Sequence, residues 1–171
     1  MRDVGLVTAP TQTYRTTLDD AVLTSCPQIA GPDHGPPDDL FLIDLNDLTA
    51  VSNYMWLTPD NCDDMHGAPS CPPRSITTAD NYAAQLIPRI LNSSVSKTHQ
   101  AALFIIWDEA SYCTTSSQIP AIWIGPIIKQ GYLSNYHYNH YSYLKIIETL
   151  WTLPSLQTFD TTATPMTEFF R

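Results

Sequence analysis

The stretch Ala101-Ala102-Leu103-Phe104-Ile105-Ile106-Trp107 decides the fold of this 171-residue chain. Its seven residues are all apolar, and the polar residues Asp108 and Glu109 follow it directly. Short apolar runs that end at polar or turn residues are typical of buried strands. We therefore predict a buried strand over residues 101–107, with two carboxylates just beyond its end.

Three weaker apolar runs predict further strands over residues 40–45, 54–57 and 119–124. The run at 54–57 stops at Thr58-Pro59, and the run at 119–124 stops at Gly125-Pro126, so both end at turn residues. The segment before them, residues 1–37, is rich in Thr, Pro, Gly and Asp and is predicted to be irregular. Residues 38–171 are predicted to form the folded part of the chain.

Helical periodicity appears in two places. Residues 80–91 place their apolar side chains on one side of a predicted helix, which Thr77 or Thr78 would cap and Pro88 would kink or break.

The second predicted helix follows Asn139, which would cap it, and ends at Leu153-Pro154. Leu144, Ile147 and Trp151 would share its apolar face. Strands that alternate with helices predict a three-layer α/β/α sandwich with a mostly parallel sheet. Because ligands in such folds bind beyond the carboxyl ends of the strands, the polar residues after each apolar run should converge.

Composition limits the function classes. The chain carries 17 acidic and 8 basic residues, for a net charge of −9, and contains no basic cluster, which argues against binding to nucleic acid. It lacks an apolar run of about 20 residues, so no membrane-spanning segment is expected. Its first residues lack the apolar segment of a signal peptide.

The four cysteines include no C-x-x-C pair, which argues against a structural zinc knuckle. Cys62 and Cys71 bracket a loop rich in Pro, Gly and Asp, where a disulfide would close a short ring. We therefore favour an oxidising compartment, with an extracellular or cell-surface location.

Polar residues with possible chemistry follow three of the apolar runs. They are Asp60, Asp63, Asp64 and His66 after residues 54–57, Asp108 and Glu109 after residues 101–107, and His137 and His140 after residues 119–124. Carboxylates together with imidazoles are the ligand mix of catalytic divalent metals, which polarise phosphoryl oxygens. Each group also has a simpler interpretation: an Asx turn for the aspartates, a solvated strand end for Asp108 and Glu109, a helix start for His140, and a packing surface for the aromatic residues 132–143.

Five stretches of the sequence, in order and with consistent spacing, resemble one enzyme family. They are YMWLTPDNCDDMHG over residues 54–67, ADNY over 79–82, ALFIIWDE over 102–109, IWIGP over 122–126 and YNHYSYLKIIE over 138–148. These stretches resemble the phosphoesterase family of bacterial phospholipases C and related acid phosphatases. The resemblance covers roughly residues 38–153 and implies an alkaline-phosphatase-like fold that hydrolyses phosphate esters, either phosphomonoesters or phospholipids.

The resemblance also implies roles for particular residues. Asp108 and Glu109 match the acidic pair that holds a divalent metal, whose identity is open. Asp64, His66 and His140 match catalytic residues that face the substrate phosphate.

The family's early Glu-Asn-x-Ser-Phe element is absent from this chain, and the nucleophile is not assigned. The resemblance therefore implies the C-terminal part of a catalytic domain, with little turnover by this chain alone. Two alternatives remain open: a non-catalytic remnant that binds metal or phosphate, and a carbohydrate-active protein in which Asp63 or Asp64 works with Asp108 or Glu109.

Overall fold

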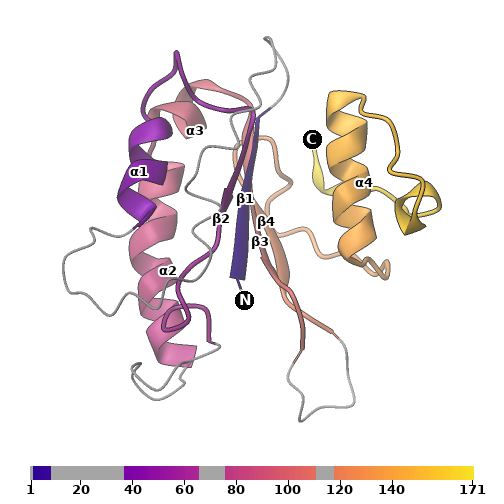
Figure 1. Cartoon of the computed structure of the whole chain (residues 1–171), viewed down its shortest axis with the longest axis horizontal. Coiled ribbons are helices and arrows are strands. Elements are labelled where there is room, and N and C mark those ends of the chain that lie inside the picture. Colours follow the sequence, from indigo (N-terminus) through magenta and orange to yellow (C-terminus); the bar gives the residue numbers. More distant parts are fainter. Residues whose placement is uncertain (1, 9–36, 66–75, 111–117) are drawn as a thin grey trace.

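The computed structural model of the protein describes residues 2–8, 37–65, 76–110 and 118–171. Within these ranges four strands form one sheet, and helices lie on both sides of it (Figure 1). In chain order the elements are β1 (Arg2–Thr8), α1 (Pro37–Asp44), β2 (Tyr54–Leu57), α2 (Ile76–Leu91), α3 (Ser94–Thr98), β3 (Ala101–Trp107), β4 (Ala121–Ile124), α4 (His140–Trp151) and the 3₁₀ turns η1 (Phe159–Thr161) and η2 (Thr167–Phe169). The described part of the chain is mixed α/β, as the sequence predicted.

The strand order is β2-β1-β3-β4, and each neighbouring pair of described strands is antiparallel. This differs from the mostly parallel sheet that the sequence predicted. The helical connection through α2 and α3 does bring β3 back in the same direction as β2, as a crossover connection should. However, β1 lies between these two strands and runs the opposite way, so β2 and β3 are not neighbours.

β1 is also an unexpected element, because residues 1–37 were predicted to be irregular. Arg2–Thr8 pairs with both neighbours: Val4 lies opposite Leu57 of β2 and Ile105 of β3. A strand in this position gains backbone hydrogen bonds along both edges, so tertiary pairing decides its conformation more than local composition does. Residues 9–36 lie outside the described residues.

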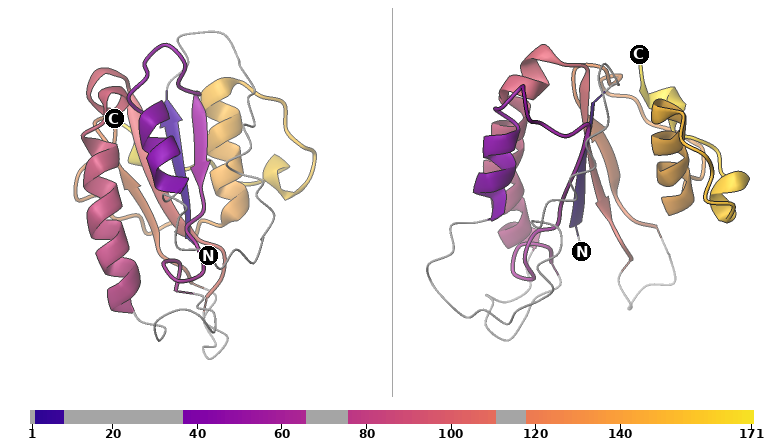
Figure 2. Two further views of the ribbon diagram at one scale, coloured as in Figure 1. Left: turned by 60° about the vertical axis from the view of Figure 1, so that its left-hand side comes forward. Right: turned by 45° about the horizontal axis from the view of Figure 1, so that its top comes forward.

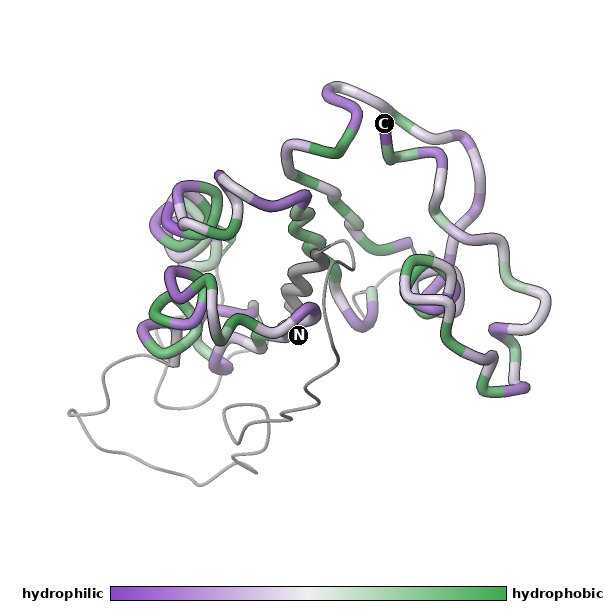
Figure 3. Tube along the Cα trace, turned by 90° about the horizontal axis from the view of Figure 1, so that it is seen from above, coloured by the Kyte–Doolittle hydropathy of each residue, from purple (hydrophilic) through white to green (hydrophobic). Residues whose placement is uncertain are grey.

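β3 separates two apolar cores. Ala101, Leu103 and Ile105 belong to a core shared with α1, α2, α3 and β2, while Phe104 and Ile106 belong to a second core shared with α4. This division follows from the geometry of a strand, in which successive side chains point to opposite faces. Figure 2 shows α1 and α2 on one face of the sheet and α4 on the other. Seen from above, the strands between these helices are mostly hydrophobic, whereas the helices mix both kinds of residue (Figure 3).

Two local predictions on the first side of the sheet need correction. The apolar run at residues 40–45 forms most of helix α1 instead of a strand. Phe41, Leu42 and Leu45 are buried, which is the i, i+1, i+4 spacing of one helix face. Helix α2 continues through Pro88 to Leu91, without a break at the proline.

Helix α4 begins after Asn139, as predicted, and ends at Trp151. Its buried face includes Tyr143, Ile146 and Trp151, whereas Leu144 and Ile147, which the sequence assigned to this face, are half-buried. The buried face of α4 is therefore rotated about the helix axis relative to the face that the sequence predicted. Tyr143 explains the rotation, because its ring stacks on Phe104 of β3 with centroids 4.6 Å apart. No helix in the described ranges is long and apolar enough to cross a membrane.

Phe104→Ala should lower the free energy of unfolding by about 3–5 kcal/mol, because the Phe104 ring is fully buried between Trp123 and Tyr143. The measurement is chemical denaturation followed by tryptophan fluorescence. Phe159→Ala is the matched control, since the Phe159 side chain is 72% exposed, and it should cost less than 1 kcal/mol. Equal losses in the two variants would contradict the placement of β3.

Candidate functional site

The segments predicted to carry chemistry meet at one edge of the sheet. β2 and β3 run in the same direction, and their final residues lie near the beginning of β1, where Val4 pairs with Leu57 and Arg2 pairs with Trp107. The residues that follow β2 therefore start at the same edge as the residues that follow β3. The antiparallel β1 between them does not alter this, because it changes only which strands are neighbours.

Helix α4 brings His140 to that edge. Asn139 forms a capping box: its Oδ1 accepts a hydrogen bond from the Ser142 backbone N–H at 3.1 Å, and the Asn139 backbone N–H donates to Ser142 Oγ at 3.4 Å. The cap fixes His140 as the first helical residue. His140 Nε2 lies 3.2 Å from the carbonyl oxygen of Trp107, the last residue of β3.

The acidic pair directly follows this contact. Asp108 and Glu109 come immediately after Trp107, and both are exposed. The His140 imidazole is therefore anchored to the residue that precedes the pair. A shared site for His140 with Asp108 and Glu109 stays a prediction.

The aspartate loop after β2 contains side chains of two kinds. Asp60 Oδ1 accepts hydrogen bonds from the backbone N–H groups of Cys62 at 2.7 Å and Asp63 at 3.2 Å, so Asp60 forms an Asx turn. Asp64, in contrast, is buried, with 1% of its surface exposed. His66, which the sequence assigned to the same loop, lies outside the described residues.

Cys62, in the same loop, is disulfide-bonded. The other three cysteines lie outside the described residues.

The described side chains at this edge are of the types that bind a divalent metal, but they are too few to form a metal site. Carboxylates from Asp108 and Glu109 and the imidazole of His140 are suitable ligand types for zinc or manganese. Within the described ranges, however, no three His, Cys, Asp or Glu side chains come together as a metal-binding group. A complete metal site at this edge would therefore need ligands from beyond the described residues, such as His66.

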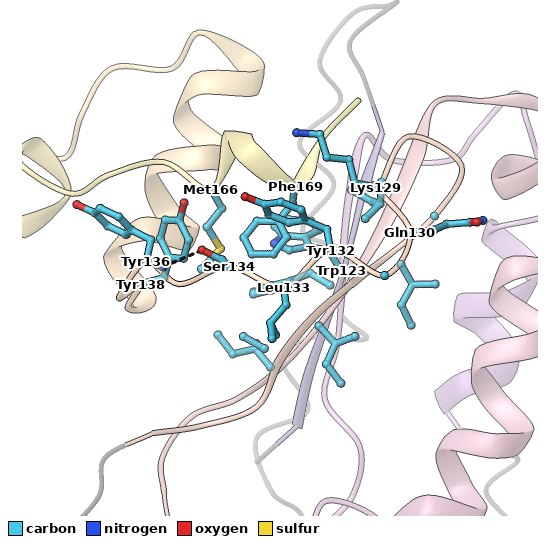
Figure 4. A pocket seen from close by; sticks show the side chains of 18 of the residues that line it. Trp123, Lys129, Gln130, Tyr132, Leu133, Ser134, Tyr136, Tyr138, Met166 and Phe169 are labelled. Carbon is cyan, nitrogen blue, oxygen red and sulfur yellow. Dashed lines mark hydrogen bonds between the residues drawn. The ribbon is translucent and has the colours of Figure 1, made fainter.

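A pocket of about 1200 Å³ adjoins this edge, and the sequence did not predict it (Figure 4). It runs along β4, which is one of the two outer strands of the described sheet, and is bounded by residues 125–140 and by Met166 and Phe169. Gly125 allows the chain to leave the end of β4 in close contact with the backbone of Ala101. Its φ is +152°, and a Cβ there would lie 2.5 Å from the carbonyl oxygen of Ala101. The signal for the pocket in the sequence was the aromatic run at 132–143, for which a packing surface was the simpler of the interpretations.

Glu168 organises the aromatic wall of this pocket. Its carboxylate accepts hydrogen bonds from Ser134 Oγ and from the hydroxyl groups of Tyr132 and Tyr138, each tyrosine at 2.8 Å. These donors hold the pKa of Glu168 below its ordinary value. The pKa of Tyr138 is raised, first by burial and then by its hydrogen bond to the Glu168 carboxylate. Both phenols therefore stay protonated and keep donating to Glu168 at neutral pH.

A second acidic group, on the other side of α4, has a structural role. Asp160 is fully buried and accepts hydrogen bonds from Ser155 Oγ, Thr158 Oγ1 and two backbone N–H groups. These bonds lower the pKa of Asp160, with the largest effect from Ser155. Asp160 thereby closes the loop after α4.

Helices on both faces of a sheet, with polar residues after β2 and β3 at one edge, place the chain among the mixed α/β proteins, although its described strands are antiparallel. The comparison with known families identifies the chain further, because the Phosphoesterase family model matches residues 37–154. The chain belongs to the phosphoesterase family, as its sequence motifs predicted. No curated protein and no solved structure matches the chain. Family membership supports hydrolysis of phosphate esters as the general activity.

Asn139→Ala should lower the free energy of unfolding by about 1 kcal/mol, because it removes the cap of α4. Asn139→Asp should retain most of the stability, since a carboxylate also accepts from the Ser142 N–H. Thermal unfolding followed by circular dichroism measures both changes. Asn135→Ala, at an exposed position in the preceding loop, is the control and should have little effect. A loss of stability in Asn135→Ala as large as in Asn139→Ala would argue against the cap.

Proposed function

We propose that this chain serves in metal-dependent hydrolysis of phosphate esters, either phosphomonoesters or phospholipids, at the sheet edge that Asp108 and His140 occupy. The supporting observation is the 3.2 Å contact between His140 Nε2 and the carbonyl oxygen of Trp107, in a chain of the phosphoesterase family. This contact holds an imidazole beside the residue that precedes the acidic pair, although 30 residues lie between Glu109 and His140. In this proposal Asp108 and Glu109 hold the metal, and Asp64, His66 and His140 face the phosphate.

The proposed roles follow from the chemistry of each side chain. A bound divalent metal would supply positive charge to the phosphoryl oxygens. The His140 imidazole is suited to transferring a proton to the departing oxygen of the ester. The capped start of α4 adds a partial positive charge near that position, which favours the phosphate. Asp64, which is buried, is suited to orienting a neighbouring group by hydrogen bonding.

We also propose that the described elements belong to an alkaline-phosphatase-like α/β/α fold. The helices on both faces of the sheet support this, as do β2 and β3, which run in the same direction. An extracellular or cell-surface location is supported by the disulfide at Cys62, because disulfides persist mainly in oxidising compartments.

One alternative has support from the structure. A non-catalytic relative that binds metal or phosphate weakly would also fit the described residues, because these residues bring no three potential ligands together. A carbohydrate-active protein is less favoured, because the family match points to phosphate esters. Metal binding and turnover, measured separately, distinguish the catalytic protein from the non-catalytic relative.

Asp108→Asn should weaken the binding of Zn²⁺ or Mn²⁺ by more than tenfold in isothermal titration calorimetry. Loss of an outer-shell partner already costs about 10–100-fold in metal affinity, and a direct ligand should cost at least as much. Asp44→Asn, an exposed substitution in the last turn of α1, is the matched control. If Asp108→Asn binds metal as tightly as Asp44→Asn does, Asp108 is not a ligand.

Hydrolysis of p-nitrophenyl phosphate by the chain should be slow, should stop when EDTA removes divalent metal, and should return when metal is added. In Asp108→Asn the rate should fall by about 100-fold, which corresponds to about 3 kcal/mol of the stabilisation that a catalytic metal supplies. A stopped assay for free phosphate measures this. Metal-dependent binding without any turnover would favour the non-catalytic alternative, and turnover that is insensitive to EDTA would refute the proposal.

A further inference from the structure

We propose that the pocket along β4 binds the leaving group of the phosphate ester and selects an apolar, ring-sized group over a small polar one. This inference rests on the proposed function and adds the class of substrate. The pocket of about 1200 Å³ is slightly larger than the usual range for small-molecule sites, roughly 300–1,000 Å³. It therefore has room for a bulky organic group attached to a phosphate.

The pocket is continuous with the candidate catalytic edge. Asn139 and His140 line one part of it, and His140 Nε2 lies 3.2 Å from the carbonyl oxygen of Trp107, which precedes Asp108. An ester with its phosphate at this end can therefore extend its alcohol portion along β4. In this position His140 lies between the phosphate and the pocket, where the bond to the leaving group would break.

The lining of the pocket is largely apolar and aromatic. Figure 4 shows Tyr132, Phe169, Trp123 and Met166 grouped together at the pocket, with Leu133 beside them. The Tyr132 ring meets Phe169 edge-on, with centroids 5.5 Å apart. Because the hydroxyl group of Tyr132 is held by the carboxylate of Glu168, the ring is fixed in place and its polar group is already hydrogen-bonded. A wall of fixed rings suits another flat, apolar group.

Two features of this wall indicate that a ligand covers it. Leu133 is 85% exposed, and Ile122, Tyr132 and Tyr136, which also line the pocket, are exposed too. Apolar side chains that gather around one pocket and remain in contact with water are typical of binding sites. In addition, Trp123 is 92% buried, and its indole Nε1 has no hydrogen-bond partner within the described residues. This donor is suited to an oxygen atom of a ligand.

The charge of the lining agrees with an anionic ester. The chain carries a net charge of −9, yet no Asp or Glu is among the described residues that line the pocket. Lys129, His137 and His140 are among them. The described lining of the pocket therefore adds no carboxylate that would repel an anionic ester, in a protein whose overall charge is strongly negative.

Binding of matched probes tests the proposal directly. In titrations followed by ¹H–¹⁵N NMR, 1-naphthyl phosphate should bind at least tenfold more tightly than glycerol 2-phosphate and should shift the amide signals of Tyr132 and Leu133. Leu133→Ser should reduce this preference by about threefold to tenfold, because it removes an apolar contact. Leu133 is so exposed that its replacement should not affect folding.

Leu156→Ser is the matched control, because Leu156 is 68% exposed and lies outside the pocket, and it should leave the preference unchanged. 1-Naphthol, which has no phosphate, separates this inference from the proposed function. Binding of 1-naphthol that Leu133→Ser weakens supports the pocket even if turnover is undetectable. Equal affinity for the two phosphate esters, or signal shifts that avoid residues 122–138, would overturn the inference while leaving the proposed hydrolysis intact.

Discussion

The burial of β3 on both faces is the constraint on which the rest of the structure depends. Because Phe104 and Ile105 point to opposite sides, the strand must be covered twice, by α1, α2 and α3 on one side and by α4 on the other. Once α4 packs on the Phe104 face, its first residue lies beside the last residue of β3. The contact between His140 and the carbonyl oxygen of Trp107 is therefore a consequence of core packing.

The sequence predicted those elements whose signals are local and strong. The ends of β2 and β3 and the start of α4 agree with the apolar runs at residues 54–57 and 101–107 and with the cap at Asn139. The prediction from sequence failed where contacts with distant parts of the chain decide the local structure. Residues 2–8 become a strand because two neighbours pair with them, and residues 40–45 become helical although a short apolar run fits either structure.

For the candidate site, too, the sequence predicted some features and missed others. The sequence predicted that the polar residues after each apolar run converge, but this reasoning does not account for His140, because β4 is antiparallel to β3 and ends at the opposite edge of the sheet. The packing of α4 on β3 is what brings His140 to the carbonyl oxygen of Trp107. The pocket was not predictable, because it depends on Glu168, near the C-terminus, which fixes Tyr132 and Tyr138 from about 30 residues away. No spacing or periodicity connects a glutamate with tyrosines so distant in sequence. Metal binding by Asp108 and Glu109 remains a prediction, because no three possible ligands come together within the described residues, and His66 lies outside them.

The position of β1 has a consequence for how the chain folds. Its residues pair with residues 54–57 and 101–107, so the central ladders of the sheet join parts of the chain about 50 and about 100 positions apart. Closing such long loops costs entropy before the contacts that compensate for it have formed. During synthesis, residues 2–8 leave the ribosome before residues 54–57 and 101–107, but they acquire their second neighbour only after residue 107 has emerged. Among the described strands, the first to be made is thus among the last to be completed.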